Sequence, residues 1–168
     1  MQHAIPIFAG LCFIGGQLFA AASDARWMRI PNLLILFLLA GYAVTATLTQ
    51  PGWAVIAAHA GVGAAILAGG LVLFARGWMG GGDVKLLAVS GLWLGPAAVP
   101  GFLVLTALAG GILTLALIAW RALARAHQLD GGPIAALRDP KGRVPYGIAI
   151  AAAAIAVAFL RPGALLTG

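Results

Sequence analysis

The stretch from Trp53 to Ala75, WAVIAAHAGVGAAILAGGLVLFA, decides the fold class of this chain. It holds no Lys, Arg, Asp or Glu. As an α-helix it would be about 34 Å long, at 1.5 Å per residue. The hydrocarbon core of a bilayer is about 30 Å thick, and a helix needs about 20 apolar residues to cross it. The stretch therefore predicts a helix that spans a membrane.

The rest of the chain repeats this pattern. It is 62% hydrophobic and only 8% charged, whereas soluble domains carry about 25% charged residues. The sequence predicts an all-α polytopic membrane protein, with one membrane-embedded domain over residues 1–168. Besides residues 53–75, we expect transmembrane helices at residues 4–22, 33–48, 84–97, 101–120 and 144–160, which makes six.

The basic residues indicate the orientation of these helices. The net charge is +6, from ten Lys or Arg against four acids. The basic residues gather in the loops 23–32, 76–83 and 121–143, and the opposite side carries only Arg161. Because cytoplasmic loops are enriched in Lys and Arg, these loops are expected inside and both termini outside. The charge thus reflects topology and the bilayer, and we expect no nucleic-acid partner.

The four acids of the chain are all aspartates and fall into two classes. Asp130 and Asp139 stand beside Gly or Pro in the loop 121–143, so we expect them to be solvated turn residues. The same loop is expected to hold a short surface helix at 134–137. Asp24 and Asp83 lie at the ends of predicted membrane segments, where an acid is a functional-site hypothesis by default. Ion pairing with nearby Arg or Lys remains the alternative.

The residues around Asp83 favour a functional site. They read Gly80-Gly81-Gly82-Asp83, and three glycines leave the backbone uncovered, so that a substrate chain can approach closely. Asp83 can also lie in the first turn of the next helix, where free amides stabilise a carboxylate. The sequence does not determine whether the glycine run is helical or extended.

Three motifs resemble those of the type IV prepilin peptidases, which belong to the GxGD aspartic peptidases. Residues 80–83 and the following Val-Lys-Leu resemble the family signature. The family's second catalytic aspartate follows its first helix and matches Asp24, ahead of Ile-Pro-Asn at 30–32. The motif Val-Pro-Tyr-Gly at 144–147 resembles the one that opens the family's last helix. The matches occur in the expected order along nearly the whole chain.

The resemblance implies that Asp24 and Asp83 are the catalytic pair. Lys85 either orients the pair, contacts the substrate or only extends its ammonium to the interface. Asn32 is also expected to suit the start of a helix, because its side chain can cap free amides. Residues expected to bind the substrate or to shape the site are Gly80, Gly81, Gly82, Lys85, Asn32, Pro145 and Tyr146. Helix-entry packing is the alternative for the last two.

The resemblance also implies a function. The chain would be an endopeptidase of the bacterial inner membrane, cleaving the basic leader from type IV prepilins or pseudopilins at the cytoplasmic face. Larger members carry an N-terminal domain with two CxxC pairs and N-methyltransferase activity. This chain has one cysteine, Cys12. It therefore resembles the short, peptidase-only form that serves Flp/Tad pili, and we expect no methyltransferase domain.

A pair of aspartates implies a mechanism without metal. Two neighbouring carboxylates share one proton; the ionised one takes a proton from water, and the protonated one donates a hydrogen bond to the scissile carbonyl. The histidines, His3, His59 and His127, lack ligand spacing, so we expect no metal and no cofactor. A proton-coupled transporter and a structural membrane subunit are the competing interpretations. The sequence leaves the oligomeric state and the particular pilin open.

Overall fold

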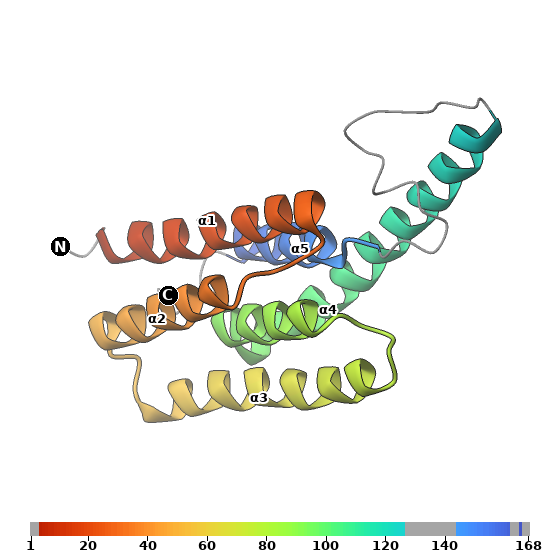
Figure 1. Ribbon diagram of the computed structural model, residues 1–168. Helices are drawn as coiled ribbons and strands as arrows, with labels where there is room; N and C mark the ends of the chain where they lie inside the picture. The colour runs from red at the N-terminus through yellow and green to blue at the C-terminus, as the bar shows by residue number, and fades with distance from the viewer. Residues whose placement is uncertain (1–3, 127–143, 162–164, 166–168) are drawn as a thin grey trace.

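The computed structural model describes residues 4–126, 144–161 and 165, and within them the chain is helical, without strands (Figure 1). The helices are α1 (Ala4–Trp27), α2 (Asn32–Thr49), α3 (Trp53–Ala75), α4 (Gly81–Ala126) and α5 (Tyr146–Leu160). The first four are long and apolar enough to cross a membrane, and α5 is a shorter apolar helix. This confirms the prediction of an all-helical chain suited to a membrane.

Helix α4 contains both predicted segments 84–97 and 101–120. It is interrupted at Gly95, whose φ of 70° and ψ of 173° are not helical. Figure 1 shows the two arms of α4, before and after Gly95, running in nearly opposite directions. The chain therefore turns back at Gly95 rather than in the expected loop 98–100.

His59 from α3 stabilises this turn. Pro96 has no N–H group, so the carbonyl of Leu92 lacks its helical donor. The Nδ1 atom of His59 lies 2.9 Å from that carbonyl oxygen and supplies a partner for it. Gly95 has the positive φ that favours glycine, and a Cβ there would collide with the ring of His59. His59 thus belongs to the turn.

Several helix ends differ from the expected ones, and two of the differences matter for function. Helix α1 continues beyond residue 22 to Trp27, so Asp24 lies in its last turn rather than in a loop. It ends where Met28 adopts a φ of 51°. Helix α4 begins at Gly81, so the last two glycines of the run are helical and Asp83 lies in the first turn.

Two differences lie elsewhere. Helix α4 runs on to Ala126, inside the expected loop 121–143, while the start of α5 falls at Tyr146 rather than 144. The expected helix at 134–137, Asp130 and Asp139 lie outside the described residues.

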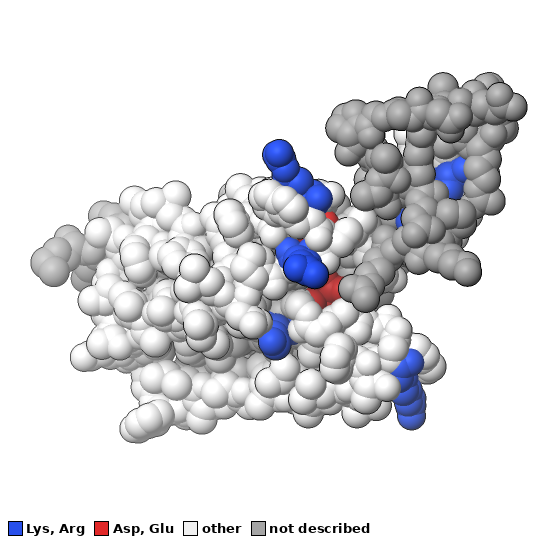
Figure 2. Space-filling view, in the orientation of Figure 1, with Lys and Arg blue, Asp and Glu red and all other residues white. Residues whose placement is uncertain are grey.

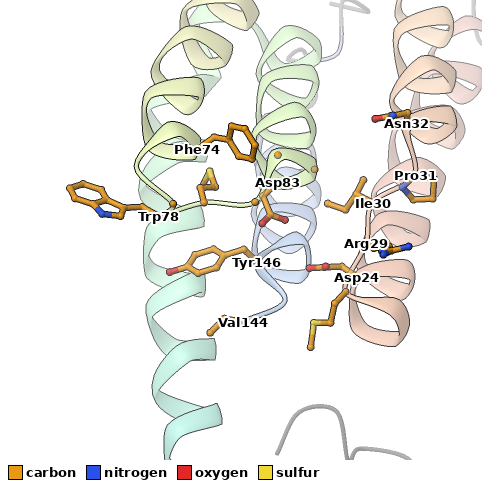
Figure 3. Close-up of a pocket in the computed structure, with 16 residues that line it drawn as sticks. Asp24, Arg29, Ile30, Pro31, Asn32, Phe74, Trp78, Asp83, Val144 and Tyr146 are labelled. Atoms are coloured by element: carbon orange, nitrogen blue, oxygen red, sulfur yellow. The ribbon is translucent and has the colours of Figure 1, made fainter. Parts of the chain in front are cut away.

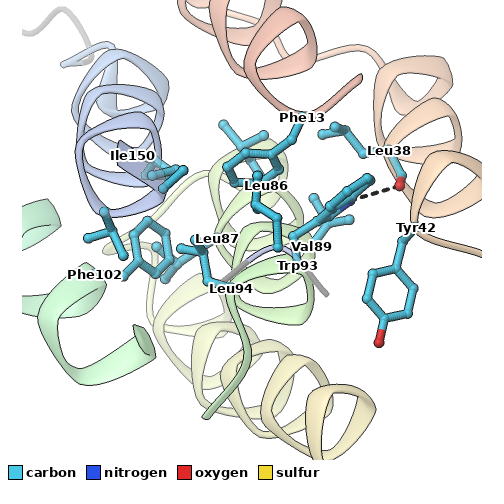
Figure 4. Close-up of a cluster of buried hydrophobic side chains, with 14 of the residues drawn as sticks. Phe13, Leu38, Tyr42, Leu86, Leu87, Val89, Trp93, Leu94, Phe102 and Ile150 are labelled. Carbon is cyan, nitrogen blue, oxygen red and sulfur yellow. Dashed lines mark hydrogen bonds between the residues drawn. The ribbon is translucent and has the colours of Figure 1, made fainter. Parts of the chain in front are cut away.

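The core lies where the helices meet. Helix α4 packs mainly against α3 and α5, and α1 packs against α2 and α5. Trp93 is fully buried at the centre, with its ring centroid 5.4 Å from that of Phe13. Its Nε1–H donates a 2.9 Å hydrogen bond to the carbonyl of Leu38 (Figure 4). Large apolar side chains such as Leu33 and Leu71 remain exposed on the outside, as expected for a surface that faces lipid.

The two ends of the bundle differ in charge. At one end α1 and α3 finish and α2, α4 and α5 begin. Figure 2 shows Lys and Arg side chains over this end, with acidic atoms between them, and a largely uncharged body beyond. The opposite end holds the α2–α3 connection, the turn at Gly95 and Arg161, which donates to the carbonyl of Ala97 at 2.7 Å. The first end therefore concentrates the charge.

Candidate active site

A cavity of about 860 Å³ lies at the charged end of the bundle. All five helices or the segments beside them contribute to its wall. Asp24 from α1 and Asp83 from α4 both line it, and Figure 3 shows their carboxylates entering the same space. The other lining residues are Met28, Arg29, Ile30, Pro31, Asn32, Phe74, Gly77, Trp78, Met79, Gly80, Gly81, Gly82, Val144 and Tyr146.

Asp24 is held by the start of α5. Its side chain is 5% exposed, and its Oδ2 accepts a 2.7 Å hydrogen bond from the backbone N–H of Gly147. Gly147 lies in the first turn of α5, where amides have no helical partner and the helix dipole favours a negative charge. A Cβ on Gly147 would lie 2.8 Å from Oδ2 and 3.0 Å from the Cβ of Asp24. Glycine therefore allows this contact.

Gly147 was not among the site residues expected from the sequence. The sequence motif at 144–147 predicts only Pro145 and Tyr146 at the site. The one feature of the sequence that could have indicated Gly147 is its place as the last residue of this motif. Because the partner of Gly147 stands 123 positions earlier, its role as a hydrogen-bond donor emerges only from the folded chain.

Asp83 is surrounded by the glycines that precede it. It is half-buried in the first turn of α4. A Cβ on Gly80 would lie 2.7 Å from its Oδ2, while one on Gly82 would lie 3.2 Å from the Cβ of Ile30. A Cβ on Gly81 would meet the ring of Phe74 at 3.3 Å. Of the three, Gly80 is thus the glycine that directly gives room to the carboxylate.

Tyr146 and Pro145 differ in their relation to the cavity. Tyr146 lines it and also packs on the second arm of α4, where a Cβ on Gly110 would lie 2.5 Å from the tyrosine ring. Pro145 is the N-cap of α5, with a φ of −73°, and is not among the lining residues. Tyr146 thus both shapes the cavity and packs at the start of α5, whereas Pro145 only begins the helix.

Asn32 and Lys85 bind each other. The Nζ of Lys85 donates a 2.9 Å hydrogen bond to Oδ1 of Asn32. Asn32 is the first residue of α2, whose N-cap is Pro31, and no side chain caps that helix. The expected capping role of Asn32 is therefore wrong, because its amide oxygen faces the ammonium group instead. Asn32 lines the cavity, whereas Lys85 is exposed and does not line it.

Other lining residues carried no functional signal in the sequence. Trp78 is 71% exposed and forms part of the cavity wall. Arg29 lies in the turn after α1, where its carbonyl accepts a 2.7 Å hydrogen bond from Oγ of Ser23. Such residues are recognised only through their position in the fold.

Within the part of the chain that the structure describes, no three His, Cys, Asp or Glu residues are grouped so that they could hold a metal ion.

Sequence comparisons relate the chain to known proteins. A sequence model of the type IV leader peptidase family matches residues 11–115, a range that includes both aspartates but not the motif at 144–147. A prepilin leader peptidase/N-methyltransferase of Bacillus subtilis (strain 168) is 29% identical over 132 residues. These residues are 77% of this chain and 52% of the relative, so the chain spans about half the length of that protein. No solved structure matches the chain.

Proposed function

Because this chain belongs to the type IV leader peptidase family, we propose that it cleaves the leader peptide from type IV prepilins, as an aspartic endopeptidase with Asp24 and Asp83 as its catalytic pair. One observation carries the proposal. Two aspartates on different helices, α1 and α4, line one cavity at the charged end of an apolar bundle. A transporter or a structural subunit, the other interpretations of the sequence, would not account for the family membership.

The proposed reaction uses one protonated and one ionised carboxyl group. The ionised carboxylate takes a proton from water, whose oxygen attacks the scissile carbonyl carbon, while the protonated group gives its proton to the carbonyl oxygen. The resulting diol collapses as the C–N bond breaks. The leaving nitrogen takes a proton from the group that received one from water, and a diol hydroxyl returns a proton to the other. The pair thus ends with the single proton with which it started.

The surroundings of the pair suit a polypeptide substrate. The cavity volume of about 860 Å³ lies in the usual range for ligand sites. Gly80 adds no side chain beside Asp83, so an extended chain can approach the carboxylate closely. The substrate that we propose is a prepilin or pseudopilin whose basic leader lies in the cytoplasm and whose apolar helix lies in the bilayer.

We propose that the cavity faces the cytoplasm of a bacterium and that the protein is a multi-pass protein of the inner membrane. The support is the gathering of Lys and Arg over the cavity end (Figure 2), because such residues favour the cytoplasmic side. Taking the two arms of α4 as separate crossings, we propose six crossings with both termini outside. Labelling of single cysteines in a Cys12→Ala background, from either side of the membrane, tests this: Trp53→Cys should react from outside and Trp78→Cys from inside.

We assign only the peptidase step to these 168 residues. They contain one cysteine, Cys12, and hence no CxxC pair of the kind that the N-methyltransferase domain of larger members carries. We propose that the substrates are Flp/Tad prepilins, on the resemblance to the short form of the family. Parallel cleavage assays with Flp-type and other type IV prepilins decide this point, and a preference for the latter would contradict it.

The test of the function is processing of a prepilin in membranes. The protein is co-expressed with candidate prepilins, and removal of the leader is followed as a mobility shift with the wild type, Asp24→Asn and Asp83→Asn. Either substitution should abolish cleavage while the protein still inserts. Asp130→Asn and Asp139→Asn are the matched controls, since the sequence predicts turn residues there, and they should cleave normally. Near-normal cleavage by Asp24→Asn or Asp83→Asn would overturn the assignment of the pair.

A further inference from the structure

A buried hydrogen bond joins α1 to the first arm of α4, well inside the bundle. The Nε2 of Gln17 donates to Oγ of Ser90 over 2.7 Å, and both residues are fully buried. The main packing neighbours of α1 are α2 and α5, while those of α4 are α3 and α5. Together with the ring contact of Phe13 and Trp93, the bond directly connects two helices that otherwise pack mainly against other helices.

The two bonded residues stand at matching positions relative to the aspartates. Asp24 follows Gln17 by seven residues, and Asp83 precedes Ser90 by seven. Seven residues make about two helical turns, with a rise of about 10.5 Å, and return to nearly the same face. Both stretches are continuously helical, so each aspartate lies on the face of its helix that carries the bonded residue.

The helix directions make these two steps parallel in space. Helix α1 runs toward the cavity end, and the first arm of α4 starts there and runs away from it (Figure 1). Asp24 therefore lies closer to the cavity than Gln17 does, by about two helical turns. Asp83 lies closer to the cavity than Ser90 does, by the same distance. Pairing Gln17 with Ser90 brings the two aspartates to the same level.

Gln17 also has an unusual environment. Its Oε1 is buried and has no hydrogen-bond partner among the described residues, and such burial costs free energy. An apolar side chain of similar size would avoid this cost but could not bond to Ser90. The hydrogen bond between Asp24 and Gly147 joins α1 to α5. It does not fix how far α1 is shifted along α4, that is, the register of these two helices.

We infer that Gln17 and Ser90 are positioning residues, whose hydrogen bond sets the register of α1 against α4 and so holds the carboxylates of Asp24 and Asp83 at one level. The inference rests on the proposed function for its meaning in catalysis. The position of α1 along α4, and with it the proximity of the two aspartates, can be measured in a protein without peptidase activity.

The first experiment is kinetic. Gln17→Leu and Ser90→Ala remove the bond, and misplacing catalytic groups by about 1 Å costs up to about a hundredfold in rate. We expect kcat for prepilin cleavage to fall at least about tenfold, with KM within about twofold because the substrate surface of the cavity is retained. Ser90→Thr keeps a hydroxyl and should restore most of the rate.

The matched control is Thr45→Val. Thr45 is also fully buried, but its hydroxyl donates to the carbonyl of Gly41 within α2 and bridges no helices. This variant removes a buried hydroxyl without touching the register, so its kcat should stay near the wild-type value. An equal loss in Thr45→Val and Gln17→Leu, or unchanged kcat in Gln17→Leu and Ser90→Ala, would overturn the inference.

The second experiment measures the register directly. Asp24→Cys and Asp83→Cys are combined in a Cys12→Ala background, and the rate of joining by a short bifunctional thiol reagent is followed. Joining should be fast in this protein and in its Thr45→Val form, and slow once Gln17→Leu is added. Equal rates in all three, or no joining in any, would contradict the inference. If the wild type cleaves no prepilin, the proposed function fails, while this measurement still decides the register.

Discussion

The backbone amide of Gly147 donates a 2.7 Å hydrogen bond to the buried carboxylate of Asp24, across 123 positions of sequence. The bond joins the last turn of α1 to the first turn of α5. It gives a role to the glycine of the motif at 144–147, which lies outside the range of the family match. The amide orients one member of the proposed catalytic pair, and a helix N-terminus favours its charged form.

Replacing Gly147 by alanine is expected to impair catalysis. The new Cβ would lie 2.8 Å from Oδ2 and 3.0 Å from the Cβ of Asp24, so the carboxylate must move away from the amide. We expect kcat for prepilin cleavage to fall by about tenfold or more, because small displacements of catalytic groups are costly. Gly15→Ala, in the same helix as Asp24 and with nothing within 4 Å of the added atom, is the control. Equal activity of the two variants would contradict the role of the amide.

The glycines before Asp83 should differ in their tolerance of alanine. At Gly80 the Cβ would lie 2.7 Å from Oδ2 of Asp83, whereas at Gly81 the nearest atom is 3.3 Å away, on Phe74. We expect Gly80→Ala to lower the cleavage rate by at least about tenfold, and Gly81→Ala to have a smaller effect. The assay is initial rates in the same membranes, with Gly69→Ala, which meets nothing within 4 Å, as control. A larger loss at Gly81 would refute this order.

Lys85 and Asn32 should behave as a coupled pair. Their 2.9 Å hydrogen bond is exposed. Hydrogen bonds to charged groups contribute about 1.5–3 kcal/mol, and exposure to solvent reduces this contribution. We expect Lys85→Met and Asn32→Leu to cause similar, moderate losses of cleavage, and the double variant to lose little more than either. A double-mutant cycle on kcat/KM measures this. If Asn32→Leu were silent and Lys85→Met inactivating, the lysine would act on the reaction through another partner.

The turn at Gly95 should govern stability. Gly95 has a φ of 70°, and a Cβ there would run into the ring of His59. Gly95→Ala should therefore lower the free energy of unfolding by about 1–3 kcal/mol, from backbone strain and from displacement of the ring. Thermal unfolding in detergent measures the loss. Gly101→Ala has open space around the added atom and should unfold like the wild type; a matching drop in both variants would contradict the argument.

Hydrophobicity along the chain was enough to predict the helices. The span 53–75 agrees with α3 residue for residue, because an uninterrupted apolar run leaves a chain in lipid no alternative to satisfying its backbone by helix formation. For α1, the sequence predicts an end at residue 22, five residues before the observed end at Trp27. The polar residues Ser23, Asp24 and Arg26 resemble a loop in composition, but they continue the helix to Trp27.

The sequence by itself determined the fold class, the charged end of the bundle and the two aspartates as the acids to examine, since apolar runs, basic loops and glycines beside an acid are local properties. The tertiary structure decided the rest. It shows that α4 turns back at Gly95. It also shows which residues form hydrogen bonds between helices: Gly147 with Asp24, Asn32 with Lys85, and Gln17 with Ser90. These contacts join residues from different helices, and their partners follow from how the helices pack, which no single stretch of sequence encodes.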